Sequence, residues 1–118
     1  MNDDRLADFL DHMSAAANDA CSFVEGMSKR EFLADKRTQQ AVVMSLVIIG
    51  EAAAKIMDKY GDFAAVQPTI PWRGMRGMRN RIAHGYFDVD LGVVWDTVQT
   101  ALPKLSTQLR QLRNHPLA

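Results

Sequence analysis

Apolar residues recur at steps of three and four along most of the chain, which is the spacing of one face of an α-helix. The first such stripe predicts a helix over about residues 3–25, which Gly26 ends. Ser28 and Glu31 then form a Ser-x-x-Glu capping box, in which each side chain can bond the other residue's backbone N–H. A short second helix is therefore expected through about residue 33.

The longest predicted helix follows Asp35, whose carboxylate can cap its first turn, and runs to Tyr60. Between residues 41 and 49 this helix is apolar on nearly all sides. It should therefore be the central helix of a bundle, or face both a core and a partner. A fourth helix begins near Pro71, a residue suited to a first turn, and Gly85 closes it.

A fifth helix covers about residues 91–112 and can be capped by Asp88 or Asp90. Pro103 lies inside this helix and should kink it, because proline lacks the N–H that the helix needs. No segment alternates apolar and polar residues convincingly with the period of two that indicates a strand. The predicted fold class is all-α, an antiparallel bundle of about four to five helices.

The composition fits one soluble domain, with 118 residues of which 47% are hydrophobic and 24% charged. The single cysteine, Cys21, excludes an intramolecular disulfide and a cysteine-based zinc site. The longest apolar run is too short to span a bilayer, and the acidic N-terminus does not fit a signal peptide. We expect a cytoplasmic protein without membrane contact, with one helical domain over residues 1–114 and a short tail over 115–118.

Charge is segregated along the chain, although 14 basic and 14 acidic residues cancel overall. Residues 1–25 carry six acidic side chains and one arginine, a net charge of −5. Residues 63–87 contain four arginines and no acid, a local charge of +4. A solvated helix face or a contact with the acidic segment of another subunit would explain this patch. The use of arginine throughout favours phosphate, because a guanidinium group binds phosphate through two parallel hydrogen bonds.

The candidate chemistry centres on one histidine. The sequence has no His-Glu-x-x-His motif and no close cluster of metal ligands, so neither a metal nor a cofactor is expected. Cys21 lies in an apolar stripe and is interpreted as a small core residue. His12 belongs to the acidic first segment, and His115 to the C-terminal tail. Only His84 lies in the acid-free basic segment, beside a glycine and close to a tyrosine.

Two glycines interrupt the predicted fourth helix. Gly74 and Gly77 each cost roughly 1 kcal/mol relative to alanine inside a helix. Either another helix or a nucleotide backbone approaches closely there, or the first turns of this segment are irregular. The sequence leaves both interpretations open.

The segment around His84 resembles a known family. Arg79, Asn80, three further residues and His84 match the motif of the HEPN domains (higher eukaryotes and prokaryotes nucleotide-binding). His84 and Tyr86 extend the match to the His-x-Tyr motif of the HepT-like ribonuclease toxins. The resemblance covers almost the whole chain in order and spacing, including residues 32–37, 49–53, 71–73 and 76–80.

This resemblance implies a HEPN-like bundle that acts as a homodimer and a metal-independent endoribonuclease. It also implies a toxin of a toxin–antitoxin pair, neutralised by a minimal nucleotidyltransferase of the MntA type. In that family the antitoxin attaches AMP to the motif tyrosine, which is Tyr86 here. If Tyr86 lines the cleft, the bulk and negative charge of AMP would exclude RNA phosphate.

The same residues suit metal-free cleavage of RNA, in which the 2′-OH attacks the adjacent phosphate. That reaction needs a base, an acid and positive charge. His84 can be the acid or the base because histidine titrates near neutral pH, and Arg79 can hold the phosphate. Asn80 could orient either group or the phosphate. Because one chain supplies one suitable histidine for two roles, we expect a two-fold dimer that brings both copies of His84 into one cleft.

The spacing of the motif adds a geometric condition. On a continuous helix Arg79 and His84 point about 140° apart, whereas Arg76, Asn80 and His84 share one face. Either the helix unwinds before Gly85, or the two copies of Arg79 complete the site across the dimer. We favour the shared cleft and assign Arg76 a supporting contact with the substrate.

Several other residues have structural interpretations. Trp72 and Trp95 are expected in the core rather than as platforms on which bases stack. Glu51, in the apolar third helix, could be buried and paired with an arginine of the fourth helix, so it stays outside the catalytic set. The alternative to an enzyme is a non-enzymatic helical subunit that binds a minimal nucleotidyltransferase and uses the basic patch to hold nucleotide or protein.

Overall fold

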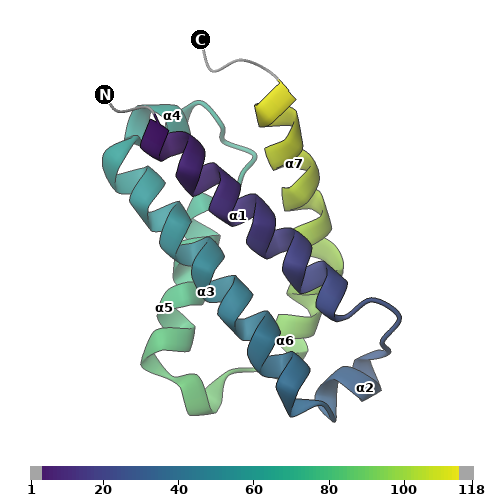
Figure 1. Ribbon diagram of the computed structural model, residues 1–118. Coiled ribbons are helices and arrows are strands. Elements are labelled where there is room, and N and C mark those ends of the chain that lie inside the picture. Colours follow the sequence, from purple (N-terminus) through teal and green to yellow (C-terminus); the bar gives the residue numbers. More distant parts are fainter. Residues whose placement is uncertain (1–3, 115–118) are drawn as a thin grey trace.

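Long helices run alternately up and down the molecule in the computed structural model, which describes residues 4–114 (Figure 1). They are α1 (Asp4–Phe23), α3 (Lys36–Lys59), α5 (Trp72–His84) and a last rod that begins with α6 (Leu91–Asp96) and ends with α7 (Leu102–Asn114). The described residues contain no strand, and the predicted all-α antiparallel bundle is confirmed. His115 and the rest of the predicted tail lie outside the described residues.

Two short helices, α2 (Lys29–Leu33) and α4 (Gly61–Ala65), join the long ones. The predicted capping box is present: the Glu31 N–H donates to Ser28 Oγ, and the Ser28 N–H donates to Glu31 Oε1. The sequence pattern does not predict α4, because five residues are too few for an apolar period to show. Tertiary contacts fix this helix instead, since the ring of Phe63 packs edge-on against Trp72.

The last rod contains a π-helical turn over Thr97–Ala101, just before the proline that was expected to kink it. Asp90, one of the two candidates, caps the start of the rod. Pro103 has no N–H to donate to the carbonyl four residues earlier. The Leu102 N–H donates to the carbonyl of Thr97, five residues back, so the helix shifts its hydrogen-bond register and continues.

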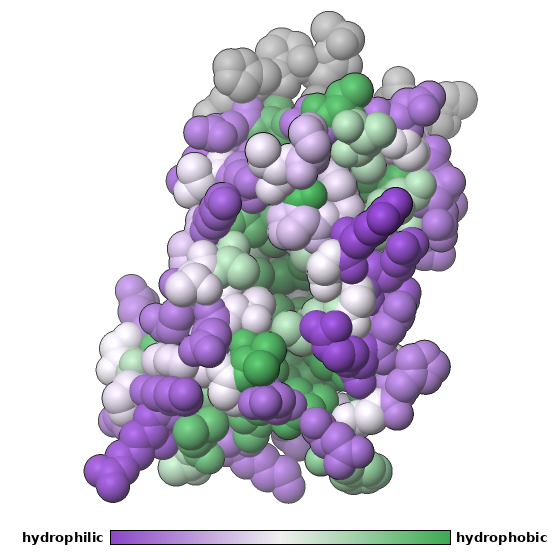
Figure 2. All heavy atoms as spheres, turned by 180° about the vertical axis from the view of Figure 1, so that it is seen from behind, coloured by the Kyte–Doolittle hydropathy of each residue, from purple (hydrophilic) through white to green (hydrophobic). Residues whose placement is uncertain are grey.

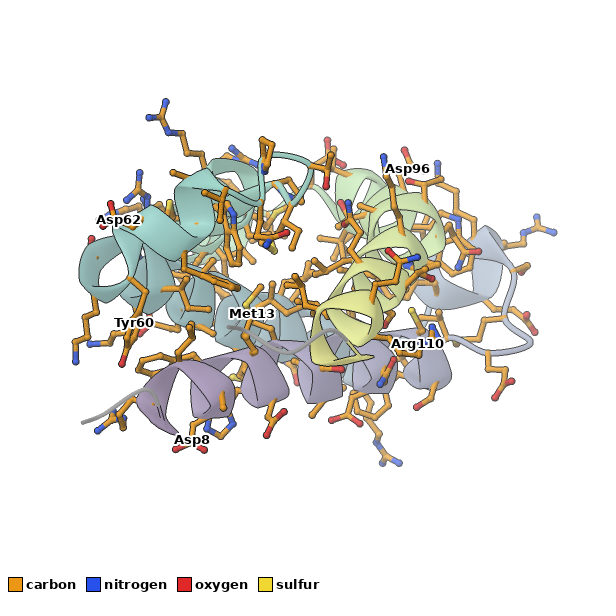
Figure 3. All side chains as sticks on the ribbon, turned by 90° about the horizontal axis from the view of Figure 1, so that it is seen from above. Asp8, Met13, Tyr60, Asp62, Asp96 and Arg110 are labelled. Atoms are coloured by element: carbon orange, nitrogen blue, oxygen red, sulfur yellow. The ribbon has the colours of Figure 1, made fainter. Side chains whose placement is uncertain are left out.

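Helix α3 is the central helix, as its apolar surface predicts, and packs against both α1 and α5 (Figure 1). Helix α1 has an inner and an outer face. In the view from above, Met13 points into the core and Asp8 points outward (Figure 3). Among the described helices, α3 is the one that is long and apolar enough to cross a membrane by length and composition. Its place in the core of the bundle accounts for that apolarity.

The outer surface nevertheless keeps apolar areas. Met44 and Ile48, one turn apart on α3, are 58% and 40% exposed. On the back of the molecule, hydrophilic side chains gather along the edge that carries α5, and an apolar hollow lies beside them (Figure 2). This hollow is a cavity of about 200 Å³ between α3, α5 and the last rod. Its lining includes Leu46, Ile49, Met75, Met78, Leu102 and Leu105.

Candidate active site

Helices α3 and α5 come into close contact at Arg79, the first residue of the motif. Gly50 lies in the middle of α3 and has no side chain to separate the two helices. A Cβ at Gly50 would overlap the Cβ of Arg79 and come within 2.7 Å of the carbonyl oxygen of Met75. The backbone of α3 therefore forms the surface against which Arg79 lies. Sequence reasoning missed this role of Gly50, for which the one available signal is a glycine inside an otherwise apolar helix.

Two polar groups hold the guanidinium group of Arg79. Glu51, the residue after Gly50, forms an ion pair and hydrogen bond with Nη1. The Nε–H donates to Oδ1 of Asn80 at 2.8 Å. The side chain of Arg79 is 23% exposed and that of Glu51 is 51% exposed. Glu51 is thus paired with an arginine of α5 as the sequence suggested, but its expected burial is wrong, because α3 turns this residue toward solvent.

His84 is the last residue of α5 and is exposed. The helix continues through it, and the Gly85 N–H still bonds the carbonyl of Arg81, so unwinding before Gly85 does not occur. Arg79 and His84 therefore point about 140° apart, and one copy of the chain does not bring them together. Asn80 and Arg76 lie about one and two turns before His84 on the same helical face, as predicted.

Gly77 lies about two turns before His84 on the same face of α5, whereas Gly74 borders the apolar cavity between α3, α5 and the last rod. The segment is a regular helix, so the interpretation of irregular first turns is wrong. A Cβ at Gly74 would meet the Cβ of Pro71 only at 3.8 Å, and one at Gly77 would meet Arg81 Nη1 at 3.6 Å. Among the described residues, no second helix approaches here, and the close approach occurs at Gly50 instead.

Tyr86 follows the helix in a short 3-10 turn, η1 (Tyr86–Asp88). It is 49% exposed, and its ring meets that of Phe87 edge-on with 6.1 Å between centroids. Tyr86 lines a cavity of about 420 Å³ together with residues of α3 that include Lys36 and Gln40. The hydroxyl-bearing ring is therefore accessible from solvent, on the same end of α5 as His84.

Most charged residues of α5 form no ion pair within the part of the chain that the structure describes. Of its four arginines, only Arg79 forms an ion pair with an acidic residue of the described part. The acidic helix α1 packs against α3 and α7, so it does not cover α5. Among the side chains that the structure describes, no three from histidine, cysteine and the acidic residues lie close enough together to hold a metal ion. The site thus offers guanidinium, amide and imidazole groups to an anionic ligand.

Three residues that the sequence assigned to the core lie in it or pack against it. Trp72 is 6% exposed in the core. The ring of Trp95 packs against Phe32 with 5.4 Å between centroids. Cys21 packs against the core, and partial burial raises the pKa of its thiol. None of the three has the exposed, reactive placement of a catalytic group.

Comparison with known proteins identifies the family. A family model described as "Ribonuclease HepT-like" matches residues 13–112. The chain is 40% identical over 106 residues to "Probable ribonuclease HepT" of Thermococcus cleftensis, covering 90% of this chain and 94% of that protein. It is 35% identical over 107 residues to a Methanocaldococcus jannaschii protein whose name proposes an RNase, and the match covers 91% of this chain and 83% of that protein. No solved structure matches the chain at a significant level.

The helical bundle and its basic motif helix thus define a HEPN-type domain. The chain belongs to the HepT-like ribonuclease family, which confirms the family that the sequence resembles.

Proposed function

We propose that this protein is the toxin of a toxin–antitoxin pair, a metal-independent endoribonuclease that cuts RNA by attack of a 2′-OH on the adjacent phosphate. Membership of a ribonuclease family supports the reaction class. The observation that carries the proposal is the setting of Arg79. Its guanidinium is held by Glu51 and Asn80, yet it stays partly exposed on a basic helix that ends in the exposed His84.

Each residue of the motif has a distinct role in this reaction. A guanidinium group has five N–H donors, and the bonds to Glu51 and Asn80 use two of them, leaving three for phosphate oxygens. This permanent charge stabilises the phosphorane that forms when the 2′-OH attacks. His84 takes the proton of the attacking 2′-OH or gives a proton to the 5′-oxygen as the bond between that oxygen and phosphorus breaks, a role that histidine fills most often. Arg76, on the same face as His84, contacts a flanking phosphate.

A second copy of the chain completes the site. One chain provides a single histidine on α5, while the reaction needs an acid and a base. Gly77, about two turns before His84 on the outer face of α5, leaves room for another helix to approach His84 closely. Exposed apolar side chains nearby, Met44 and Ile48 of α3 and the 98% exposed Phe87, favour burial against a partner. A two-fold axis beside α5 would bring two copies of His84 and Arg79 into one cleft.

Tyr86 is the proposed site of control. Its exposed ring, two residues beyond His84, can be reached by a minimal nucleotidyltransferase of the MntA type that adds AMP to the hydroxyl. The added phosphate would lie beside arginines that otherwise attract RNA, so inactivation follows from repulsion and occlusion. RNA as substrate and a nucleotidyltransferase as partner both place the protein in the cytoplasm.

The decisive experiment measures cleavage of RNA by the purified protein with EDTA present. Loss of a general acid–base group should slow cleavage by about 10²–10⁴-fold in His84→Ala, and Arg79→Ala should be similarly impaired. His12→Ala and Arg37→Ala remove an exposed histidine and an exposed arginine from α1 and α3 and should cleave normally. Cleavage by His84→Ala at the parental rate would refute the assignment. Absence of chelator-resistant cleavage, with tight co-purification of a nucleotidyltransferase, would instead establish the binding-subunit alternative.

Control by AMP is tested separately. Incubation with the nucleotidyltransferase and ATP should add one AMP group to the chain, release pyrophosphate and stop cleavage. Tyr86→Phe should still cleave RNA but resist modification, whereas Tyr60→Phe, which alters the other tyrosine, should be modified and inactivated. Modification of Tyr86→Phe at the normal rate would exclude Tyr86 as the target.

A further inference from the structure

We propose that Glu51 is a positioning residue for the cleavage reaction, which fixes the guanidinium of Arg79 in the orientation that receives the scissile phosphate. This inference rests on the proposed function of the Arg79 site. It assigns a role to a carboxylate that lies outside the motif, on a different helix and 28 positions away in the sequence.

The first argument is geometric. Gly50 lets the backbone of α3 lie directly against the stem of Arg79, which sets the distance between the two helices. Glu51, the next residue on α3, then reaches Nη1 from one side. Asn80, the next residue on α5, accepts from Nε on the other side. Two anchors on different atoms fix the rotation of a planar group, so the Nη2 donors keep one direction.

The second argument concerns what the ion pair stabilises. Because the side chain of Glu51 is 51% exposed, water screens the pair and its effect on folding stability is small. An unanchored arginine would have to be ordered each time a phosphate binds, at a cost in side-chain entropy. The Glu51 pair orders the guanidinium before RNA arrives. The expected consequence of its loss is therefore a slower reaction in a protein that folds normally.

The variants that test this inference are Glu51→Ala and Glu51→Gln, with Asp58→Ala as the matched control. Asp58 is an exposed acid on the same helix, two turns away, with no ion pair to an arginine of α5 among the described contacts. Misplacing a reacting group can cost on the order of 10²-fold, so Glu51→Ala should lower kcat by about 10- to 100-fold with little change in KM. Glu51→Gln, whose amide oxygen can still accept from Nη1, should recover most of kcat. Asp58→Ala should match the parent.

A double-mutant cycle separates positioning from an independent role. If Glu51 acts only through Arg79, then Glu51→Ala should not slow the residual cleavage of Arg79→Ala any further. An equal further loss in that background would mean that Glu51 acts on the substrate itself, as a base for instance, and would overturn the inference. So would a Glu51→Ala variant that cleaves normally or binds RNA more tightly, the latter indicating a carboxylate that competes with phosphate.

A spectroscopic measurement keeps the inference distinct from the proposed function. The Nη–H signals of Arg79, identified by their absence in Arg79→Lys, should be protected from solvent exchange in the parent and in Asp58→Ala, because Glu51 accepts from Nη1. They should exchange faster in Glu51→Ala, with an unchanged unfolding midpoint. An unchanged signal would disprove the positioning contact even if the protein cleaves RNA. A parent protein that cleaves no RNA would instead refute the proposed function, whatever this signal shows.

Discussion

Gly50 of α3 lies so close to Arg79 of α5 that no side chain would fit between the two residues. A Cβ at this position would overlap the Cβ of Arg79 and lie 2.7 Å from the carbonyl oxygen of Met75. The obstacle is backbone and the base of a side chain, neither of which can swing aside as a flexible side-chain end would. The contact that brings the central helix against the motif helix is therefore the same contact that seats the motif arginine.

Replacing Gly50 with alanine should consequently damage both stability and activity. Inserting a methyl group into a packed contact typically costs about 1–3 kcal/mol, which outweighs the gain of roughly 1 kcal/mol in helix propensity. Denaturant unfolding should show this loss, and RNA cleavage should fall because α3 and α5 move apart at Arg79. Gly61→Ala is the matched control: a Cβ there meets nothing within 4 Å, so its stability should be equal or higher. A Gly50→Ala variant as stable as the parent would contradict the close approach.

Arg76 provides a test of phosphate binding that does not depend on catalysis. Binding of a short single-stranded RNA should weaken in Arg76→Ala, and the slope of log Kd against log salt should change by about 0.7 for one lost phosphate contact. Arg110→Ala removes the same charge from α7 (Figure 3). Arg110 lines a hollow with Ser14 and Asn18 of α1. This control should leave the slope unchanged. Equal effects of both substitutions would indicate a general charge effect without a specific contact.

The sequence predicts the parts of this fold that depend on local signals. The capping box at Ser28 and the cap at Asp35 are short-range hydrogen bonds between neighbours in the chain, and both appear as expected. The central place of α3 follows from its apolar surface. The short helix α4 and the π-helical turn before Pro103 escape prediction, because distant packing and a shifted hydrogen-bond register leave no periodic signal.

The residues of the candidate site also divide into those that local sequence identifies and those that depend on how the helices pack. The motif and its resemblance identify Arg79 and His84, and helical spacing correctly gives their divergent directions. A pairing of Glu51 with α5 is expected from the sequence, but the choice of Arg79 as its partner depends on how the two helices cross. The role of Gly50 depends on the same crossing. Residues that act across helices therefore need the structure, whereas residues within one motif do not.

Asp35 makes the stability of α3 sensitive to acid. Hydrogen bonds from the backbone N–H and then the hydroxyl of Thr38 hold the pKa of the Asp35 carboxyl below its usual value of 3.8. A lowered folded-state pKa means that the stabilisation is complete above pH 3.8 and is lost as the pH falls through the folded-state pKa. Asp35→Ala should therefore have a lower unfolding midpoint at pH 7, by an amount that shrinks below pH 3.8. Asp35→Asn removes the same titrating carboxyl, so its difference from the parent should shrink below pH 3.8 in the same way, while Asp35→Asn and Asp35→Ala should differ from each other by an amount that does not depend on pH. A difference between the parent and Asp35→Ala that does not change with pH would refute the charge effect.

The number of copies of His84 in each active site can be counted by mixing. When parent and His84→Ala chains are co-expressed with different tags, they should form parent, mixed and variant dimers in random proportions. If one cleft needs both histidines, only parent dimers are active, so equal amounts should give about one quarter of the parental activity. If each chain carries a complete site, the same mixture should give about one half. Because α5 is continuous and directs Arg79 and His84 apart, we expect the quadratic result. A linear dependence would mean that a single His84 suffices and that its proton-transfer partner lies within the same chain.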